Sequence, residues 1–301
     1  MAAQLRVVRA RIRAVQSIAK ITRAQELIAS SRIVRAQQRM RAAEPYSRQL
    51  TRAVEAVVSR STTIHHPFTE EPEHPSRAAV LILTSDQGFA GAYNANALRE
   101  SARLRQLLAD RGLEPVLYVA GRKGIAWHRF RDLDMTATWS GFSVTPRYAN
   151  AREITTTLLE AFTAEQDGVD EIHLVATDFI SMLTQRPSAR RLLPLQIEET
   201  EEPAPSGPLP AYEFEPSAEV VLDALLPQYV ASRIYYAMLE AAASELASRR
   251  RAMKAATDNA NDLIETLTRE ANNARQAEIT QEISEIVGGA NALAAASATS
   301  E

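Results

Sequence analysis

The sequence predicts an α/β protein in which two long terminal helices pair as an antiparallel coiled coil and an α/β domain is inserted between them. Two observations support this prediction. Each end of the chain carries a heptad stripe of apolar residues, and the middle alternates short apolar strands with amphipathic helices. We expect five segments: a coiled-coil helix at 1–60, a linker at 61–78, the α/β domain at 79–197, an acidic linker at 198–216 and a second coiled-coil helix at 217–301.

The first predicted element is the helix at residues 1–60. No glycine occurs before Gly88, and thirteen of the sixteen stripe positions are apolar. A stripe of two residues in seven is too narrow to face a globular core, and it suits a single partner helix. The stripe consists of Leu5, Val8, Ile12, Val15, Ala19, Thr22, Glu26, Ala29, Ile33, Ala36, Met40, Ala43, Ser47, Leu50, Val54 and Val57.

Prolines break the helix between residues 61 and 78, and the pattern then changes to alternating strands and helices. Such alternation is typical of a mostly parallel sheet with helices on its faces. We expect strands at Ala79–Thr84, Glu114–Ala120 and Glu171–Thr177, and helices at Asn94–Asp110, Gly121–Arg131 and Tyr148–Gln166. We also expect an edge hairpin formed by Phe179–Gln185 and Arg190–Ile197 around Pro187-Ser188.

A Glu- and Pro-rich linker at 198–216 precedes the C-terminal helix, which Ser217 can cap. The apolar stripe changes phase beyond Arg275. If residue 60 lies near residue 217 in an antiparallel pair, Met1 lies opposite roughly residue 275, and the last ~25 residues (~35–40 Å) have no partner within the chain. We expect this overhang to meet another protein. The stripe consists of Leu239, Ala242, Leu246, Arg249, Met253, Ala256, Ala260, Leu263, Leu267, Glu270 and Ala274, then Ile279, Ile283, Ile286, Ala290 and Leu293.

Charge and composition exclude several classes of protein. The chain has no cysteine, which excludes disulfides and thiol chemistry, and its longest apolar run is too short to span a membrane. Residues 1–60 carry a net charge of +10 and residues 217–301 carry −5, which favours pairing of the two helices. Because the arginines flank an apolar seam and lack interleaved aromatic residues, we expect no nucleic-acid partner. We expect a cytosolic or peripheral membrane protein.

The motifs give little support for catalysis. The segment Ser85–Asn94 contains a glycine pair that could cradle phosphate, but it lacks the third glycine of a dinucleotide fingerprint and the lysine of a P-loop, so a structural turn is favoured. His65, His66 and His74 fall in the proline-rich loop without the spacing of a metal site. We expect no catalytic, cofactor-binding or metal-binding residues.

Four stretches resemble the γ subunit of F-type ATP synthase over nearly the full chain. They are residues 20–37; Ser85-Asp86 with Gly91–Asn94; Glu215-Pro216-Ser217 with Leu225–Tyr229; and the long match within residues 244–290. The sequence departs from the usual family pattern at Gln25, Leu27, Leu246 and Ala271. The resemblance implies a Rossmann-like α/β domain and a rotor shaft inside a ring of three α and three β subunits, with the ε subunit and the membrane c ring bound at its foot.

The resemblance also implies functional residues, and it places the protein at the cytoplasmic face of a bacterial membrane as a non-catalytic subunit of a proton-translocating complex. Arg275, Gln276, Thr280 and Glu282 match positions that touch the β-subunit catch loops. Ile283, Ile286 and Val287 match the shaft bearing, where Gly288-Gly289 is also typical of a helix stop. Tyr212, Phe214 and Glu215 match the contact with the c ring.

Two alternatives remain open. A static coiled-coil scaffold with an α/β head predicts a homodimer formed through the stripes, whereas a rotor subunit predicts a monomer before it joins its ring. A nucleotide-binding enzyme predicts tight nucleotide binding by residues 79–197. The sequence does not identify the coupling ion, and a proton is assumed.

Overall fold

The computed structural model describes residues 2–60, 68–195 and 218–298, which divide into two compact units. The larger unit comprises residues 29–250 and the smaller unit comprises residues 1–28 and 251–301. Long helices contribute to both units. The elements are α1 (Ala2–Arg60), β1 (Arg77–Leu83), α2 (Tyr93–Asp110), β2 (Glu114–Ala120), α3 (Arg122–Arg129), β3 (Ala137–Trp139), α4 (Tyr148–Phe162), β4 (Glu171–Phe179), β5 (Gln185–Leu193) and α5 (Ala218–Ala298). None of these helices has the length and apolarity to cross a bilayer.

The larger unit is built on a five-stranded sheet in the order β3-β2-β1-β4-β5. Strands β1 to β4 are parallel, and only the edge strand β5 is antiparallel to its neighbour. The central strand β1 reads RAAVLIL, and six of its seven residues are buried. A run that is apolar at successive positions is expected for a parallel strand covered on both faces. The predicted α/β fold is therefore confirmed.

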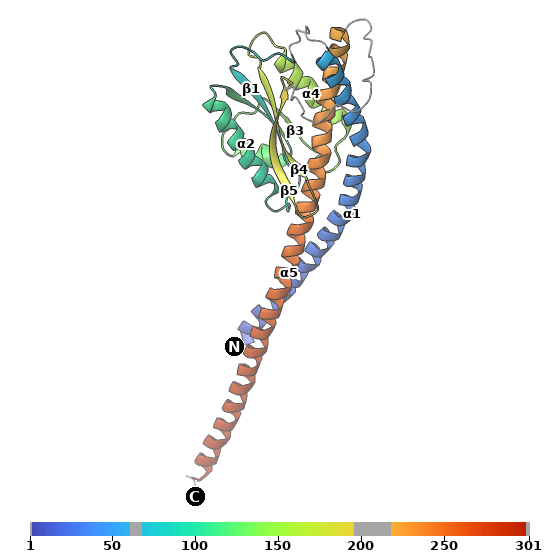
Figure 1. The fold of residues 1–301 in the computed structure, drawn as a ribbon. Helices are drawn as coiled ribbons and strands as arrows, with labels where there is room; N and C mark the ends of the chain where they lie inside the picture. The colour runs from blue at the N-terminus through green and yellow to red at the C-terminus, as the bar shows by residue number, and fades with distance from the viewer. Residues whose placement is uncertain (1, 61–67, 196–217, 299–301) are drawn as a thin grey trace. The chain divides into compact units, whose positions relative to one another are not determined.

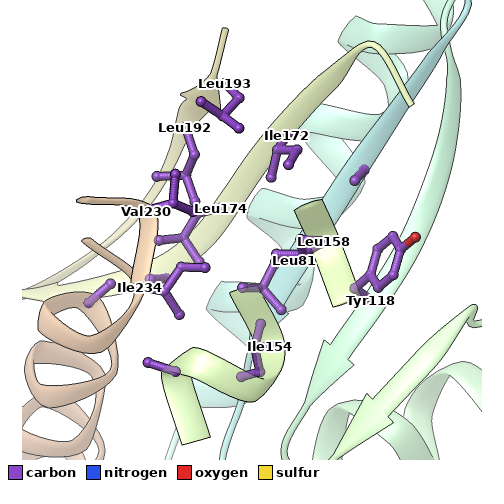
Figure 2. Packing of buried hydrophobic residues seen from close by; sticks show 14 of the residues in the cluster. Leu81, Tyr118, Ile154, Leu158, Ile172, Leu174, Leu192, Leu193, Val230 and Ile234 are labelled. Atoms are coloured by element: carbon purple, nitrogen blue, oxygen red, sulfur yellow. The ribbon is translucent and has the colours of Figure 1, made fainter. Parts of the chain in front are cut away.

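Helices cover the sheet on both faces (Figure 1). Val80 and Ile82 point to one face and pack with residues of α2 and α3, such as Leu104 and Ile125. Leu81 points to the other face, where side chains of α4 and α5 complete a larger core. Figure 2 shows this second core, with Ile154 and Leu158 of α4, Val230 and Ile234 of α5, and residues of the strands.

The predicted edge hairpin is wrong in its register. The hairpin pairs β4 with β5, and its turn lies at residues 180–184, whereas Pro187 lies inside β5 opposite Thr177. Proline is tolerated there because β5 is an edge strand, whose outer side makes no ladder hydrogen bonds. The three-residue strand β3 was not predicted, because so short a segment has no periodicity to detect.

In the smaller unit, α1 and α5 form an antiparallel pair. The hydroxyl oxygens of Thr22 and Thr257 lie 2.7 Å apart, and Val15 packs with Ala260 and Leu267 in one buried cluster. Pairing of earlier α1 residues with later α5 residues confirms the antiparallel prediction for this unit.

The predicted stripes fit α1 better than α5. Every α1 side chain that the structure describes as buried belongs to the predicted stripe. On α5, Met253, Ala260 and Leu267 were placed correctly, but the alternate positions are shifted by one residue. Ala256, Leu263 and Glu270 were expected in the seam, where the structure has Thr257, Ile264 and Ala271. Leu263 is 41% exposed. From Met253 onward the seam residues of α5 are spaced four and then three apart, whereas the prediction spaced them three and then four apart. The observed spacing brings Thr257 opposite Thr22.

Candidate functional site

The C-terminal part of α5 extends beyond the end of its partner helix, α1. With Thr22 opposite Thr257, the first described residue of α1 lies opposite roughly residue 277, so α5 continues for about 20 residues, or ~30 Å, beyond the paired region. Ala271 is the last buried residue, and none of the side chains described between 272 and 291 is buried. We call residues 275–291 the free segment. Its surface is the main candidate functional site.

The four expected catch residues all lie on the free segment and are exposed. At 100° per residue, Arg275 and Glu282 share one face of the helix, and Gln276 and Thr280 share another about 120° away. Thr280 donates its hydroxyl hydrogen to the Gln276 carbonyl oxygen at 2.9 Å, which leaves its oxygen free to accept. Within the described part of the chain, the side chains of Arg275, Gln276 and Glu282 make no hydrogen bond or ion pair. The segment therefore offers polar groups on two faces.

A third surface of the free segment is apolar. Ile283, Ile286 and Val287 are 56%, 71% and 53% exposed, and Ile279 adds to the same row one turn earlier. Four large exposed apolar side chains at helical spacing are typical of a binding surface. The helix continues through Gly288 and Gly289 to Ala298, so the glycine pair does not end it. A Cβ atom at either glycine would meet nothing within 4 Å.

The expected foot contacts, Tyr212, Phe214 and Glu215, lie outside the described residues. Their role remains a prediction from the resemblance.

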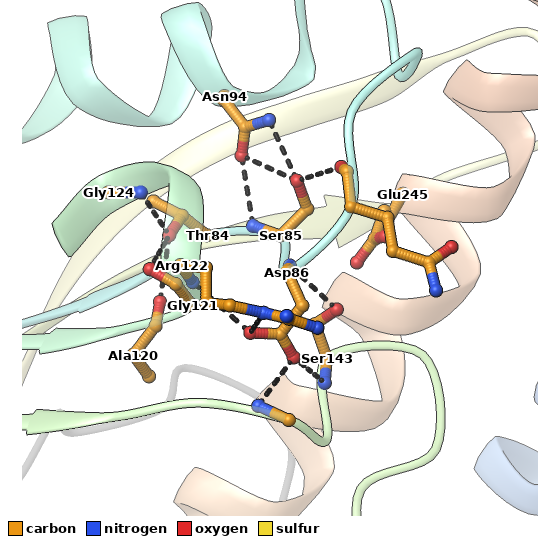
Figure 3. Close-up of polar contacts among 12 residues, drawn as sticks. Thr84, Ser85, Asp86, Asn94, Ala120, Gly121, Arg122, Gly124, Ser143 and Glu245 are labelled. Atoms are coloured by element: carbon orange, nitrogen blue, oxygen red, sulfur yellow. Dashed lines mark hydrogen bonds and ion pairs between the residues drawn. The ribbon is translucent and has the colours of Figure 1, made fainter. Parts of the chain in front are cut away.

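The segment Ser85–Asn94 forms a turn closed by the chain's own groups (Figure 3). The Asp86 carboxylate accepts hydrogen bonds from the backbone N–H groups of Arg122, Gly141 and Ser143 at 3.1, 2.8 and 2.9 Å. Burial acts to raise the pKa of the Asp86 carboxyl, but these N–H donors outweigh it and hold the pKa below its ordinary value. The backbone N–H groups at the start of α3 and at residues 141 and 143 are thus occupied by a carboxylate of this chain.

Close packing beneath this turn depends on a glycine. Gly121, between β2 and α3, has φ of 102°, and a Cβ atom there would lie 2.2 Å from the Thr84 carbonyl oxygen. The cavity beside Asp86, lined also by Tyr93 and Ser143, has a volume of about 20 Å³. That volume holds about one water molecule and is far too small for a nucleotide.

Helix α5 holds the same turn through a buried ion pair. Arg249 donates to the carbonyl oxygens of Gln87 and Gly88 at 3.1 and 3.2 Å, and its guanidinium lies 2.6 Å from the Glu245 carboxylate. Both side chains are nearly fully buried. Burial raises the pKa of Glu245, and the charge of Arg249 opposes that rise. The turn and α5 are therefore joined by polar contacts that the sequence did not predict. A charged residue inside an apolar stripe was the signal that could have indicated them.

Comparison with known proteins identifies close relatives. A family model described as ATP synthase matches residues 4–293. The chain is 59% identical to the ATP synthase gamma chain of Thermobifida fusca, with complete coverage of both chains. It is 60% identical to that of Acidothermus cellulolyticus, over 98% of this chain and 99% of the relative.

Solved structures share the fold at low sequence identity. A chain in the OSCP/F1/c-ring structure of Euglena gracilis mitochondrial ATP synthase superimposes with a TM-score of 0.69 at 15% identity, over 97% of this chain and 95% of that chain. A chain in the central stalk/c-ring structure from Tetrahymena thermophila gives a TM-score of 0.56 at 19% identity, over 78% of this chain and 99% of that chain.

Proposed function

We propose, from the premise that this chain belongs to the ATP synthase gamma-chain family and is the central-stalk rotor subunit of F-type ATP synthase, that its free segment transmits rotation to the catalytic subunits. As the rotor, the chain couples proton flow through the c ring to ATP synthesis or hydrolysis in the α/β hexamer. The observation that best supports the proposal is the free segment itself, ~25 Å of helix in which no described side chain is buried against the rest of the described chain.

The free segment has different chemistry around its circumference. Arg275 and Glu282 present charges on one face, and Gln276 and Thr280 present uncharged polar groups on another. A rotor that meets three equivalent β subunits must act on each of them differently at any moment, and it can do so only through differential contacts. We propose that these four residues are the β-subunit catch contacts, because each can gain hydrogen bonds or ion pairs without breaking one to another described side chain.

The apolar row beyond them suits a bearing. Ile283, Ile286 and Val287 contact surrounding subunits without directional bonds, and the neighbouring glycines remove side chains that could interlock. Fixed ion pairs or deep interlocking would create energy minima along the rotation path. We therefore propose that these three residues form the shaft bearing near the C-terminal end of the rotor.

We propose that the chain itself is non-catalytic and that the complex works at the cytoplasmic face of a bacterial membrane. The features most suggestive of chemistry support a structural role. Asp86 is held by backbone N–H groups, and Glu245 is paired with Arg249. We further propose that Tyr212, Phe214 and Glu215 contact the c ring, and that the ε subunit binds the α/β domain.

Replacing Gln276 and Thr280 with alanine tests the catch assignment. Each lost hydrogen bond should remove on the order of 1 kcal/mol of net interaction, so we expect steady-state ATP hydrolysis to slow several-fold. The assembled complex should form normally, because neither side chain makes a hydrogen bond to another side chain among the residues that the structure describes. A matched control replaces Thr268 and Asn272, which are exposed on the paired part of α5, with alanine. Full activity in the first variant would show that these residues are not the catch.

A further inference from the structure

A groove in the larger unit has no role in the proposed function. It lies between α1, α4 and α5 and consists of two adjoining hollows of about 410 and 450 Å³. Tyr46 and Tyr148 line both hollows, which makes the groove continuous. We call it the tyrosine groove.

The sequence explains why the three helices leave a groove there. Each helix presents one face, with lining residues spaced three or four apart, but small residues stand where a closed core would need large apolar ones. Ala42, Ala43 and Ser47 line the α1 side, and Ala231 and Ser232 line the α5 side. Because these side chains are short, they do not fill the space between the three helices. Four tyrosines, Tyr46, Tyr148, Tyr235 and Tyr236, complete the lining.

The tyrosines of the groove differ in exposure: Tyr46 is 52% exposed, whereas Tyr148, Tyr235 and Tyr236 are half-buried. The rings of Tyr148 and Tyr235 meet edge to face with their centroids 5.6 Å apart. Burial raises the pKa of the Tyr148 phenol, the nearby Tyr46 raises it further, and the charge of Arg152 lowers it. The Tyr148 phenol therefore stays protonated at neutral pH and can donate a hydrogen bond. Tyrosine offers a large apolar surface with a polar tip at low entropic cost, which is why it is enriched at protein interfaces.

The charge of the groove indicates what binds it. Arg39 lines one hollow and Arg152 lines the other. Neither guanidinium has a hydrogen bond or ion pair with any residue that the structure describes. Two carboxylates, Glu240 and then Glu44, act on the phenol of Tyr236 at the groove wall. Both are engaged by arginines outside the groove, Glu240 by Arg190 at 3.7 Å and Glu44 by Arg48 at 2.5 Å. An occupant of the groove would therefore meet two unpaired positive charges and several phenol donors.

We infer that the tyrosine groove is a docking site for an acidic segment of a partner protein in the assembled complex, with carboxylates that pair with Arg39 and Arg152. A carboxylate matches the planar donor fork of arginine, and the tyrosine rings supply apolar contact for the segment between two such anchors. This interface is separate from the free segment, because all of its residues belong to the larger unit.

Site-directed photo-cross-linking in the purified complex tests the inference. The photoreactive amino acid p-benzoylphenylalanine is placed at Tyr46, and the cross-linked peptide is identified by mass spectrometry. We expect a cross-link to a segment of another subunit that contains aspartate or glutamate. When Arg39→Glu and Arg152→Glu are added to the same labelled protein, the yield of this cross-linked peptide should fall by more than half. A control with Arg41→Glu and Arg99→Glu, exposed positions outside the groove, should keep it.

Each result decides the matter. Cross-linking to an acidic segment, lost on charge reversal and restored when that segment's carboxylates are replaced by lysine, supports the inference. A cross-link to lipid, to a second copy of this chain or to a segment without carboxylates overturns it, as does the absence of any cross-link. Failure here leaves the catch assignment untouched, because the Gln276 and Thr280 variants measure a different surface.

Discussion

The paired helices of the smaller unit can be locked together by a disulfide between residues 22 and 257. The two threonine hydroxyl oxygens are 2.7 Å apart, close to the 2.05 Å separation of bonded sulfur atoms, and the chain has no other cysteine to compete. We expect Thr22→Cys with Thr257→Cys to form an intramolecular disulfide in high yield on mild oxidation.

The expected stabilisation follows from loop closure. The disulfide joins residues separated by 235 positions, and the chain-entropy relation then gives an upper value of about 5 kcal/mol from restriction of the unfolded chain. For a protein of 301 residues the midpoint of thermal unfolding should therefore rise by up to roughly 8 °C. Far-UV circular dichroism of the oxidised and reduced protein measures the shift. Thr22→Cys with Thr268→Cys is the control, because residue 268 is exposed and three turns away from residue 257.

The same disulfide distinguishes a rotor subunit from a static scaffold protein. Because the bond lies within one chain, it links no rotor part to a stationary part, and the oxidised complex should hydrolyse ATP at nearly the unmodified rate. If oxidation yields only intermolecular dimers, the helices pair between chains and the scaffold alternative is correct. If the intramolecular bond forms but stops ATP hydrolysis, the two helices must move relative to each other during turnover, which contradicts a stiff shaft.

Three further changes probe the larger unit and the foot. Burial opposes ionisation of Glu171, but its bonds to His173 and Arg111 lower its pKa to about 2. Its ionised form therefore stabilises the fold above the unfolded-state pKa near 4.5, and this contribution is lost as the pH falls toward 2. We expect Glu171→Gln to flatten the acid side of the curve of stability against pH, measured by urea unfolding. Arg249→Ala should destabilise the larger unit by about 3–5 kcal/mol in the same assay, because Glu245 stays buried without its partner, and an unchanged midpoint would refute that role. Replacing Tyr212 and Glu215 together with alanine should loosen attachment to the c ring, so that ATP hydrolysis continues while proton pumping in membrane vesicles falls; unchanged coupling would move the contact elsewhere.

Sequence patterns predicted the parts of the fold that depend on repeating local features. The heptad spacing of α1 identified its buried face because each buried residue recurs at a fixed interval, and the apolar run at β1 marked a strand covered on both sides. The difference in length between the two helices predicted that α5 has no partner beyond about residue 275. The free segment begins there.

Long-range contacts set the remaining features, and single-residue patterns do not encode them. The hairpin was misplaced because Pro187-Ser188 has the composition of a turn, while the turn at 180–184 contains neither glycine nor proline. The backbone N–H groups that hold Asp86 come from residues 36 to 57 positions away, which no local pattern indicates. The tyrosine groove likewise depends on three helices coming together, so its residues share no motif in the sequence.

Direct observation of rotation tests the central claim. In a complex fixed to a surface through its β subunits, a gold particle is attached to a cysteine introduced at Ala109, an exposed α2 position in a chain that otherwise has no cysteine. On addition of ATP we expect the particle to turn in one direction, with pauses a third of a turn apart that reflect three equivalent β subunits. A particle that stays fixed while the same complex hydrolyses ATP would contradict the assignment of this chain as the rotor.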